Sequence, residues 1–229
     1  MQSCIGDAKL MRDPPTGWLT MADVTPTVYV VDDDVSVRES LEALIETSGW
    51  RALTFDSARA FLDCPPAPGP SCLVLDVSLP DQSGLDLQAM IADQRSEMPI
   101  LFITGYGDVP MTVRAMKAGA VEFLTKPFGE AVLLDAIEAA LARSRASVSE
   151  KAALETLSAR YATLSRRERE VMDLVVTGLL NKQVAGELGI SEITVKAHRG
   201  RVMEKMQVRS LADLVKISQK IAAAPPSQA

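Results

Sequence analysis

The segment VYVVDDD, residues 28–34, decides the fold, because a short apolar run in it ends directly in three aspartates. Such a run beside polar residues is typical of a buried strand. Apolar residues then recur at helical spacing over residues 37–45, and Gly49 follows as a stop signal. A strand followed directly by a helix is the repeating unit of α/β proteins, so the segment predicts that fold class.

The same alternation continues to about residue 145. Further strands are expected at residues 52–55, 72–75, 100–103 and 121–124, and further helices at residues 57–62, 85–94 and 109–118 and from residue 130 onward. Five short strands alternating with five helices predict a doubly wound, five-stranded parallel sheet. Ligands of such a sheet bind at the carboxyl ends of its strands.

The last third of the chain has an all-helical pattern. Four helices are expected, at residues 166–177, 182–188, 192–206 and 211–221. Ser165 and Glu168 have the spacing of a capping box, and Asn181 and Ser191 are expected to cap the second and third helices. The predicted fold class is therefore α/β plus all-α, with the sheet domain followed by a four-helix domain.

The charge of the chain is divided in the same way. Residues 1–150 carry 11 Lys and Arg against 22 Asp and Glu, whereas residues 151–229 carry 13 against 8. The formal net charge of -6 therefore hides an acidic and a basic part. This asymmetry indicates two domains, of which the second faces a polyanion.

The domain boundaries follow from these patterns. We expect a disordered extension at residues 1–25, the α/β domain at 26–146, a linker at 147–162, the helical domain at 163–222 and a disordered tail at 223–229. The cellular start is either Met1 or Met21, which lies a few residues before the first strand. No Pro or Gly occurs from Glu130 to Thr163, which allows one continuous helix through the linker. Ser144, Ser147 and Ser149 favour a hinge equally, because serine is a mediocre helix former.

Composition excludes several classes of protein. No apolar run approaches the roughly 20 residues that a membrane helix needs. Three cysteines without CxxC spacing and a single histidine, His198, exclude a disulfide scaffold and a zinc site. We expect a cytoplasmic protein that does not interact with a membrane.

Polar side chains stand at the carboxyl ends of the predicted strands. Asp32 and Asp33 follow the first strand, Asp76 the third, Thr104 the fourth and Lys126 the fifth. Parallel strands bring these positions to one edge, where crowded carboxylates suit Mg²⁺, a hard cation that keeps several waters. A carboxylate nucleophile beside such a cation can accept a phosphoryl group, whose oxygens an ammonium and a hydroxyl group stabilise.

Five runs in this part of the chain resemble the receiver domains of two-component response regulators, most closely those of the FixJ type. They are VVDDD (30–34), DVSLP (76–80), TGYGDVP (104–110), AMKAGA (115–120) and FLTKPF (123–128). The resemblance covers about residues 26–145 and implies a flavodoxin-like fold. A rival class, phosphohydrolases of the haloacid dehalogenase kind, also uses an aspartyl nucleophile and Mg²⁺, but places an acid two residues after it, where this chain has Ser78.

The resemblance also implies roles for the residues of the acidic pocket. Asp76 would be the phosphoacceptor, and Lys126 would bond the phosphoryl group. Asp33 and Asp76 would hold Mg²⁺ directly, Asp32 through water, and Ser78 through its carbonyl oxygen. The peptide bond between Lys126 and Pro127 is expected to be cis.

The same resemblance implies a switch. Thr104 would move to bond the phosphoryl group, and Phe123 would swing into the vacated space, which would change the surface of the fourth helix. Val113 and Lys117 lie on that helix and would form the contact of a phosphorylated dimer.

The third expected helix of the basic domain has two distinct sides. Val195, Val202 and Met206 recur on the side expected to face inward, while the opposite side is short-chained and basic, with Ile193, Lys196, Ala197, Gly200 and Arg201. Small residues let a helix lie deep in the major groove of DNA, and Lys and Arg contact phosphates or guanine edges.

Residues 178–191, GLLNKQVAGELGIS, and residues 194–199, TVKAHR, resemble a LuxR-type helix-turn-helix domain, over about residues 163–222. The resemblance implies a DNA-binding surface in which the residues facing the bases are Lys196, Ala197, Gly200 and Arg201. Lys182 and Arg199 would face phosphates, and Thr194 belongs to the same surface at the start of the helix.

Together these patterns predict a phosphorylation-activated transcription regulator rather than an enzyme. Its expected partners are a sensor histidine kinase, double-stranded promoter DNA, a second copy of the chain and RNA polymerase. The competing hypothesis is a receiver that serves mainly as an interaction module, with DNA binding independent of phosphate. The complete acidic pocket argues against the competing hypothesis.

Overall fold

The computed structural model describes residues 24–92 and 94–223. The chain divides into two compact units, Met1–Val148 and Ser149–Ala229. Of the expected disordered segments, residues 1–23, including Met21, and residues 224–229 lie outside the described residues. No helix in the described part of the chain is long and apolar enough to cross a membrane.

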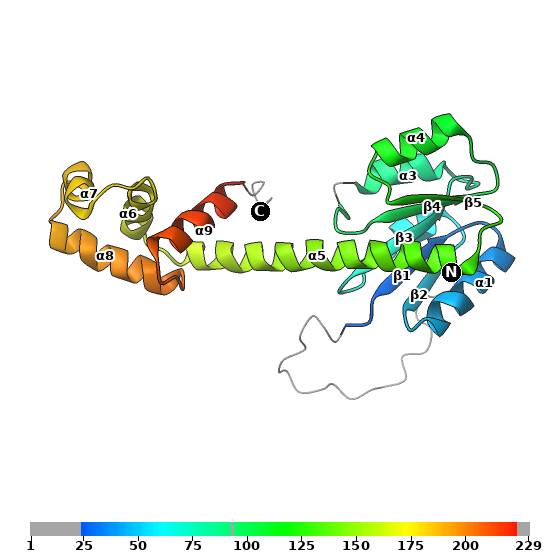
Figure 1. The fold of residues 1–229 in the computed structure, drawn as a ribbon, viewed down its shortest axis with the longest axis horizontal. Helices are drawn as coiled ribbons and strands as arrows, with labels where there is room; N and C mark the ends of the chain where they lie inside the picture. Colours follow the sequence, from blue (N-terminus) through cyan, green and yellow to red (C-terminus); the bar gives the residue numbers. More distant parts are fainter. Residues whose placement is uncertain (1–23, 93, 224–229) are drawn as a thin grey trace. The chain divides into compact units, whose positions relative to one another are not determined.

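The first unit contains the predicted five-stranded parallel sheet. Its strands are β1 (Thr27–Val31), β2 (Arg51–Phe55), β3 (Ser71–Asp76), β4 (Ile100–Thr104) and β5 (Glu122–Thr125). They pair in the order β2-β1-β3-β4-β5, with every pair parallel. The predicted sheet is confirmed, and the carboxyl ends of β1, β3, β4 and β5 lie along one edge (Figure 1).

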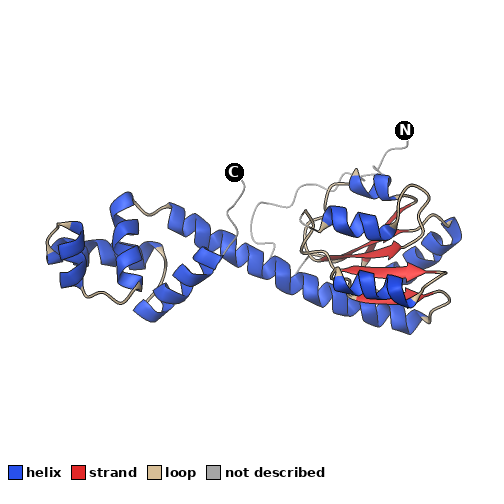
Figure 2. Ribbon diagram, turned by 90° about the horizontal axis from the view of Figure 1, so that it is seen from above, coloured by secondary structure: helices blue, strands red, loops and turns tan. Residues whose placement is uncertain are grey.

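Helices cover both faces of the sheet. They are α1 (Val35–Thr47), α2 (Ala58–Leu62), α3 (Gly84–Ile91), α4 (Val109–Lys117) and the first part of α5 (Glu130–Ala162). Buried side chains of α1 and α5 pack on one face and those of α2, α3 and α4 on the other. Figure 2 shows the strands between these two helical layers.

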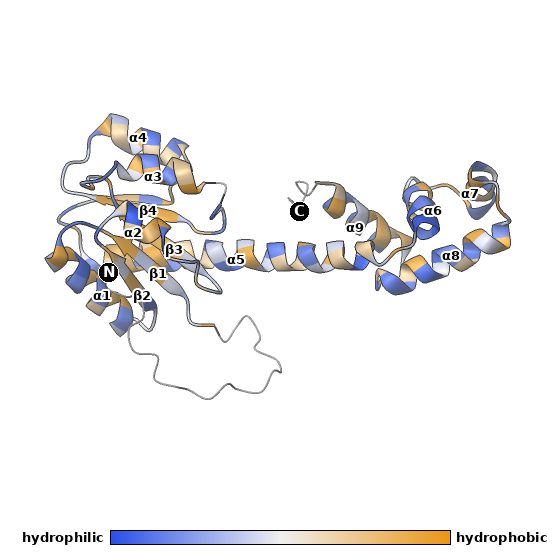
Figure 3. Cartoon of the chain, turned by 180° about the vertical axis from the view of Figure 1, so that it is seen from behind, coloured by the Kyte–Doolittle hydropathy of each residue, from blue (hydrophilic) through white to orange (hydrophobic). Residues whose placement is uncertain are grey.

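The apolar character of the strands follows from this sandwich. Tyr29 and Val31 of β1 pack with the α2–α4 layer, whereas Val28 and Val30 pack with α1 and α5. All five residues of β1 are buried, and the strands are among the most hydrophobic segments of the chain in Figure 3. Both faces need apolar side chains, so the strand sequence is a continuous apolar run rather than an alternating one.

Helix α5 decides between the two alternatives for the linker, because it runs without interruption from Glu130 to Ala162. Ser144 is 1% exposed, donates a hydrogen bond to the carbonyl oxygen of Glu97 (2.7 Å) and accepts one from the backbone N–H of Ser71 (3.0 Å). Tertiary hydrogen bonds thus satisfy a hydroxyl group that would otherwise compete with the helix backbone. The continuous helix is the alternative that the structure contains.

The second unit holds the four predicted helices after the end of α5. They are α6 (Arg166–Val176), α7 (Asn181–Leu188), α8 (Glu192–Lys205) and α9 (Leu211–Ala223). A buried cluster joins all four and includes Val171, Val184, Val195 and Leu214. The side of α8 expected to face inward is confirmed, because Val195, Val202 and Met206 are at most 1% exposed.

The start of α6 is fixed by the predicted capping box. The Ser165 hydroxyl accepts a hydrogen bond from the Glu168 N–H, and the Glu168 carboxylate accepts one from the Ser165 N–H. Lys205 of α8 also donates to this carboxylate at 2.7 Å, and the hydrogen bonds from Lys205 and Ser165 lower the pKa of Glu168 from 4.5 to about 2. One carboxylate therefore caps α6 and holds α8 against it.

The expected capping role of Asn181 is wrong. The N-cap of α7 is Leu180, whose N–H donates to Oε1 of Gln183 at 2.8 Å. The Asn181 side-chain oxygen instead accepts a hydrogen bond from Nη1 of Arg199 on α8 at 3.2 Å. The Asn181 side chain therefore connects α7 to α8 instead of capping α7.

Candidate functional site

The edge formed by the carboxyl ends of the strands brings together the polar residues singled out in the sequence. Asp76 and Thr104 end β3 and β4, while Asp32 and Lys126 come directly after β1 and β5. The backbone N–H of Lys126 donates to the Thr104 carbonyl oxygen at 2.7 Å, which fixes the loop after β5 to β4. Residues from four strands thus form one site.

A single ammonium group bridges two carboxylates at the centre of the site. Nζ of Lys126 lies 2.6 Å from Oδ2 of Asp32 and 2.8 Å from Oδ2 of Asp76. Asp32 is fully buried, and burial raises the pKa of its carboxyl group despite the hydrogen bond from Lys126. Burial alone would lower the pKa of Lys126, but hydrogen bonds to both carboxylates outweigh it and raise that pKa. The ammonium form of Lys126 is therefore favoured.

Backbone N–H groups hold the other carboxylate oxygens. Ser78 donates its N–H to Oδ1 of Asp76, and Asp34 donates its N–H to Oδ1 of Asp32, both at 2.9 Å. Asp34 itself does not join the pocket, because its side chain caps α1 by accepting the Ser36 N–H at 2.8 Å. Both pocket carboxylates are thereby held in one orientation at the edge of the sheet.

The three acidic residues are placed to hold a metal ion. One carboxylate oxygen from each of Asp32, Asp33 and Asp76 lies within 4.8 Å of the others. Asp33 is exposed, so the cluster opens to solvent on one side. An open cluster of carboxylate oxygens suits a hard divalent cation that keeps part of its water shell. The residues present therefore fit a metal site of the kind expected from the sequence.

Thr104 and Phe123 lie beside one loop. Thr104 is fully buried and accepts a hydrogen bond from the Tyr106 N–H at 3.2 Å, and Phe123 is half-buried with its ring 6.1 Å from that of Phe102. A Cβ atom at Gly107, in the loop between β4 and α4, would lie 3.1 Å from the Phe123 ring and 3.4 Å from the Thr104 methyl group. Gly107, which belongs to the run TGYGDVP but has no role predicted from the sequence, brings this loop against both residues.

Gly84 belongs to the run with residues 76–80 that resembles receiver domains, but the sequence predicts no contact for it. A Cβ atom there would lie 2.4 Å from the carbonyl oxygen of Asp76, closer than any real contact of this kind. Ser78 and Ser83 pair across the intervening loop in an isolated antiparallel bridge. Gly84 thus lets the start of α3 pack directly on the backbone of Asp76. The signals in the sequence were its place in that run and at the start of a helix.

The expected dimer residues lie on the outer side of α4. Val113 is 43% exposed and Lys117 is also exposed, while Ala115 between them is buried against the sheet. Val109 and Met116 of the same helix are exposed apolar residues as well. The outer side of α4 is therefore an apolar surface with a basic end.

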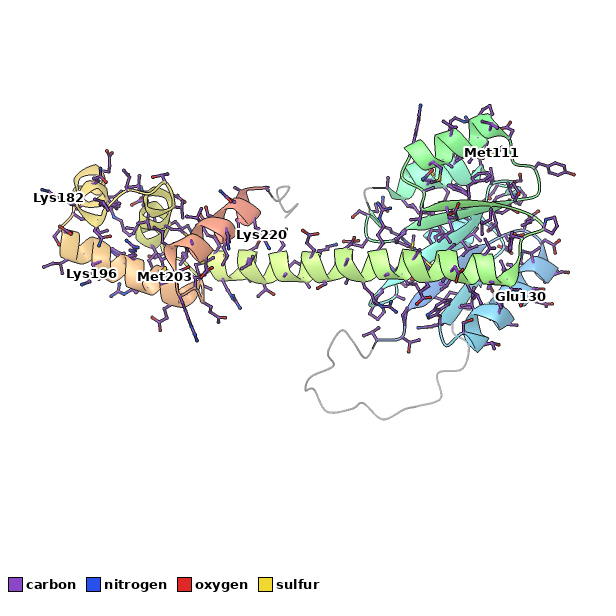
Figure 4. All side chains as sticks on the ribbon, viewed as in Figure 1. Met111, Glu130, Lys182, Lys196, Met203 and Lys220 are labelled. Carbon is purple, nitrogen blue, oxygen red and sulfur yellow. The ribbon has the colours of Figure 1, made fainter. Side chains whose placement is uncertain are left out.

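In the second unit the expected DNA-binding residues lie mainly on the exposed side of α8. Lys196, Ala197, Gly200 and Arg201 are exposed, opposite the buried Val195 and Val202. Figure 4 shows Lys196 on α8 and Lys182 on α7, and Lys182 is also exposed.

Two of the expected DNA-binding side chains also make contacts within the unit. The Thr194 hydroxyl lies 2.8 Å from that of Ser191, the N-cap of α8, and Arg199 is half-buried with its hydrogen bond to Asn181.

Comparison with known protein families matches both units. Residues 28–138 match the response regulator receiver domain, and residues 162–218 match the luxR family of bacterial regulatory proteins. Nodulation protein W of Bradyrhizobium diazoefficiens is 51% identical over 205 residues, which cover 90% of each chain. The transcriptional regulatory protein FixJ of the same organism is 42% identical and covers 84% of this chain and 94% of its own.

A solved structure supports the same relationship. The response regulator StyR, determined at low resolution, is 49% identical, with a TM-score of 0.77. The alignment covers 86% of this chain and 100% of the StyR chain. The similarity therefore extends over both units.

The geometry of the acidic cluster predicts which carboxylates a divalent cation needs. Asp33→Asn should weaken Mg²⁺ binding about tenfold, because a neutral amide replaces a charged ligand. Asp34→Ser is the matched control, since it removes a neighbouring negative charge but leaves a residue that can cap α1. Isothermal titration calorimetry of the three proteins with Mg²⁺ measures the difference. Equal losses in both variants would show that Asp33 acts through diffuse charge and not as a ligand.

Proposed function

Because this chain belongs to the two-component response regulators that join a receiver domain to a LuxR-type DNA-binding domain, we propose that Asp76 accepts a phosphoryl group and thereby controls DNA binding by α8. Membership of this family makes the protein a phosphorylation-controlled transcription regulator and not a conventional enzyme. The phosphohydrolase alternative is therefore wrong. The receiver implies a histidine kinase as partner, and the helix-turn-helix implies DNA.

The contact of Lys126 with both Asp32 and Asp76 is the observation that carries this proposal. The bridge leaves Asp76 in an acidic site, open to solvent at Asp33, whose negative charge one ammonium group only partly offsets. Such a site can take up a divalent cation together with a dianionic phosphoryl group. We assign the cation as Mg²⁺, which Asp33, Asp76 and the Ser78 carbonyl oxygen would hold directly and Asp32 through water.

The transfer itself needs one nucleophile and several groups that stabilise charge. A carboxylate oxygen of Asp76 attacks the phosphorus of a phosphohistidine on the kinase, an O–P bond forms, the P–N bond breaks, and the histidine nitrogen keeps the electron pair. Bound Mg²⁺ would screen the negative charge of the phosphoryl oxygens. Lys126 then turns from the carboxylate to the phosphoryl oxygens, and the Thr104 hydroxyl donates a further hydrogen bond to them.

The same step supplies the switch. A phosphoryl group adds roughly -1.5 to -2 charge at pH 7 and three acceptor oxygens beside Thr104. Movement of Thr104 toward these oxygens frees space for the half-buried Phe123 ring. Gly107 lies against both residues, so their movement also shifts the loop that leads into α4.

The changed surface of α4 serves dimerisation in this proposal. Val113 and Lys117 meet the same surface of a second phosphorylated chain, and two helix-turn-helix domains then bind a partly palindromic site. We place residues 26–146 in the receiver, 147–162 in the linker and 163–222 in the DNA-binding domain. RNA polymerase is a further partner at the promoter. The protein acts in the cytoplasm, where it has access to both the kinase and DNA.

Within the DNA-binding domain, the contacts divide into two kinds. Lys196, Ala197, Gly200 and Arg201 face base edges in the major groove, and Lys182 and Thr194 face the backbone. Arg199 has a double role, because its guanidinium group holds Asn181 and keeps other N–H groups for a phosphate.

Asp76→Asn tests the proposed function directly. The variant should take up no phosphoryl group from acetyl phosphate and Mg²⁺, since only the nucleophile is lost, while its circular dichroism spectrum stays unchanged. Wild-type DNA affinity should rise with the phosphoryl donor, and that of the variant should not. An affinity that is the same with and without donor in the wild type would favour the competing hypothesis, in which the receiver is an interaction module.

Val113→Asp tests the dimer surface. A carboxylate on this apolar surface should prevent phosphate-dependent dimerisation, because a desolvated, unpaired charge is costly. Met90→Asp places the same charge on a residue of α3 that is 52% exposed, and should leave dimerisation intact. Light scattering with and without phosphoryl donor measures the mass. A Val113→Asp protein that still dimerises on phosphorylation would exclude this side of α4.

Lys196 and Lys182 should contribute to DNA binding in different ways. Lys196→Ala should cost about 1–3 kcal/mol on the specific duplex and relax the preference at one position of each half-site. Lys182→Ala should weaken binding alike on all duplexes and lower the salt slope by roughly one unit per lost phosphate contact. Titrations at several salt concentrations, on specific and scrambled duplexes, separate the two effects. Equal weakening of both duplexes by Lys196→Ala would reassign that lysine to a phosphate.

A further inference from the structure

The exposed side of α8 contains an apolar side chain with no assigned role. Ile193, the second residue of the helix, is 83% exposed, and among the exposed large hydrophobic residues of the described chain only Tyr106, at 89%, is more so. A single exposed isoleucine is common on protein surfaces and indicates nothing by itself. Its place on the helix is what distinguishes it.

Ile193 stands at the centre of the side that faces away from the core. At 100° per residue, it lies within about 60° of Lys196, Ala197 and Gly200, which follow it by three, four and seven positions. Val202, nine positions later, is on the opposite side and is 1% exposed. Ile193 is therefore the apolar member of the surface that the proposed function places against bases.

The start of α8 leaves Ile193 available for a ligand. Ser191 caps the helix by accepting the Thr194 N–H, and the Thr194 hydroxyl is paired with that of Ser191. In helix-turn-helix proteins the N-terminal residues of the recognition helix reach the base edges. Side chains on a helix also lean toward its N-terminus, so Ile193 reaches beyond the first turn.

The chemistry of the side chain selects its partner. Isoleucine has neither a hydrogen-bond donor nor an acceptor in its side chain. Among the groups that the four unmodified bases present in the major groove, the apolar one is the C5 methyl group of thymine. Branching at Cβ leaves Ile193 one preferred rotamer in a helix, so little freedom is lost on contact. Ala197 and Gly200 on the same side are small enough to let the helix approach closely.

We propose that Ile193 reads a thymine by packing against its C5 methyl group, once in each half-site. This inference rests on the proposed function, in which α8 enters the major groove. It adds a thymine preference that the basic residues of the helix do not provide. The contact disfavours cytosine at that position, because an unmodified cytosine carries hydrogen where thymine carries the methyl group.

Replacement of thymine by deoxyuridine tests the contact, because it removes the methyl group and keeps the base pair. The preferred sequence is first selected from random duplexes with the full chain, acetyl phosphate and Mg²⁺. Each thymine of that duplex is then replaced singly by deoxyuridine. We expect one position per half-site at which wild-type affinity falls about fourfold, the value for one buried methyl-sized group.

A cycle with protein variants assigns the effect to Ile193. Ile193→Ala should bind the thymine and deoxyuridine duplexes equally, whereas Ala197→Gly and Lys196→Ala should keep the fourfold difference. Ile193→Ala removes an exposed side chain and adds a strong helix former, so the fold should be retained, as thermal unfolding will show.

Several outcomes would overturn the proposal. It is wrong if Ile193→Ala keeps the full deoxyuridine effect, or if no thymine replacement changes wild-type affinity. A loss of dimerisation by Ile193→Ala, with unchanged deoxyuridine effects, would make Ile193 a protein contact. A wild-type chain that selects no duplex would remove the proposed function along with this inference, whereas selection without a methyl effect removes the inference alone.

Discussion

Two carboxylates held by one ammonium group are the constraint on which the rest of the receiver depends. Asp32 is fully buried and Asp76 is 6% exposed, so neither charge is stable there without a partner. Lys126 supplies that partner from a different strand. The ends of β1, β3 and β5 must therefore lie at one edge, and the parallel sheet with its two helical layers is the arrangement that keeps them there. Any group that displaces Lys126 from Asp76 changes the charge balance of the whole edge.

The close approaches around this edge show how a change of charge can become a change of shape. Gly84 packs on the backbone of Asp76, and Gly107 packs on Thr104 and Phe123. At both places a side chain would collide with its neighbours, so the loops have little room to absorb a displacement. Packing of this kind links the pocket to the start of α3 and to the loop before α4, as the proposed switch requires.

In the second unit, the main constraint is that α8 must pack on its neighbours with one side and leave the other side exposed. One side of α8 is buried through Val195 and Val202, and the other side is left with small, basic or exposed apolar residues. Lys205, at its end, holds Glu168 of α6, and Arg199 holds Asn181 of α7. Two polar contacts thus fix α8 against its neighbours while its outer side stays available. A rigid recognition helix of this kind loses little conformational freedom on binding DNA.

The sequence by itself determined the order of strands and helices, the residues at the strand ends and the two sides of α8. These features are local, because apolar periodicity and capping residues act within a few positions of the chain. Even the bridging residues were expected to converge, since parallel strands leave no other place for their ends.

Only the tertiary structure decided how Asn181, Ser144, Gly84 and Gly107 are used. Asn181 binds Arg199 instead of capping α7, and Ser144 is satisfied by β3 and the loop before β4, so α5 continues. The partners of these residues lie far away in the chain, and no local pattern contains the distances that packing sets between such segments.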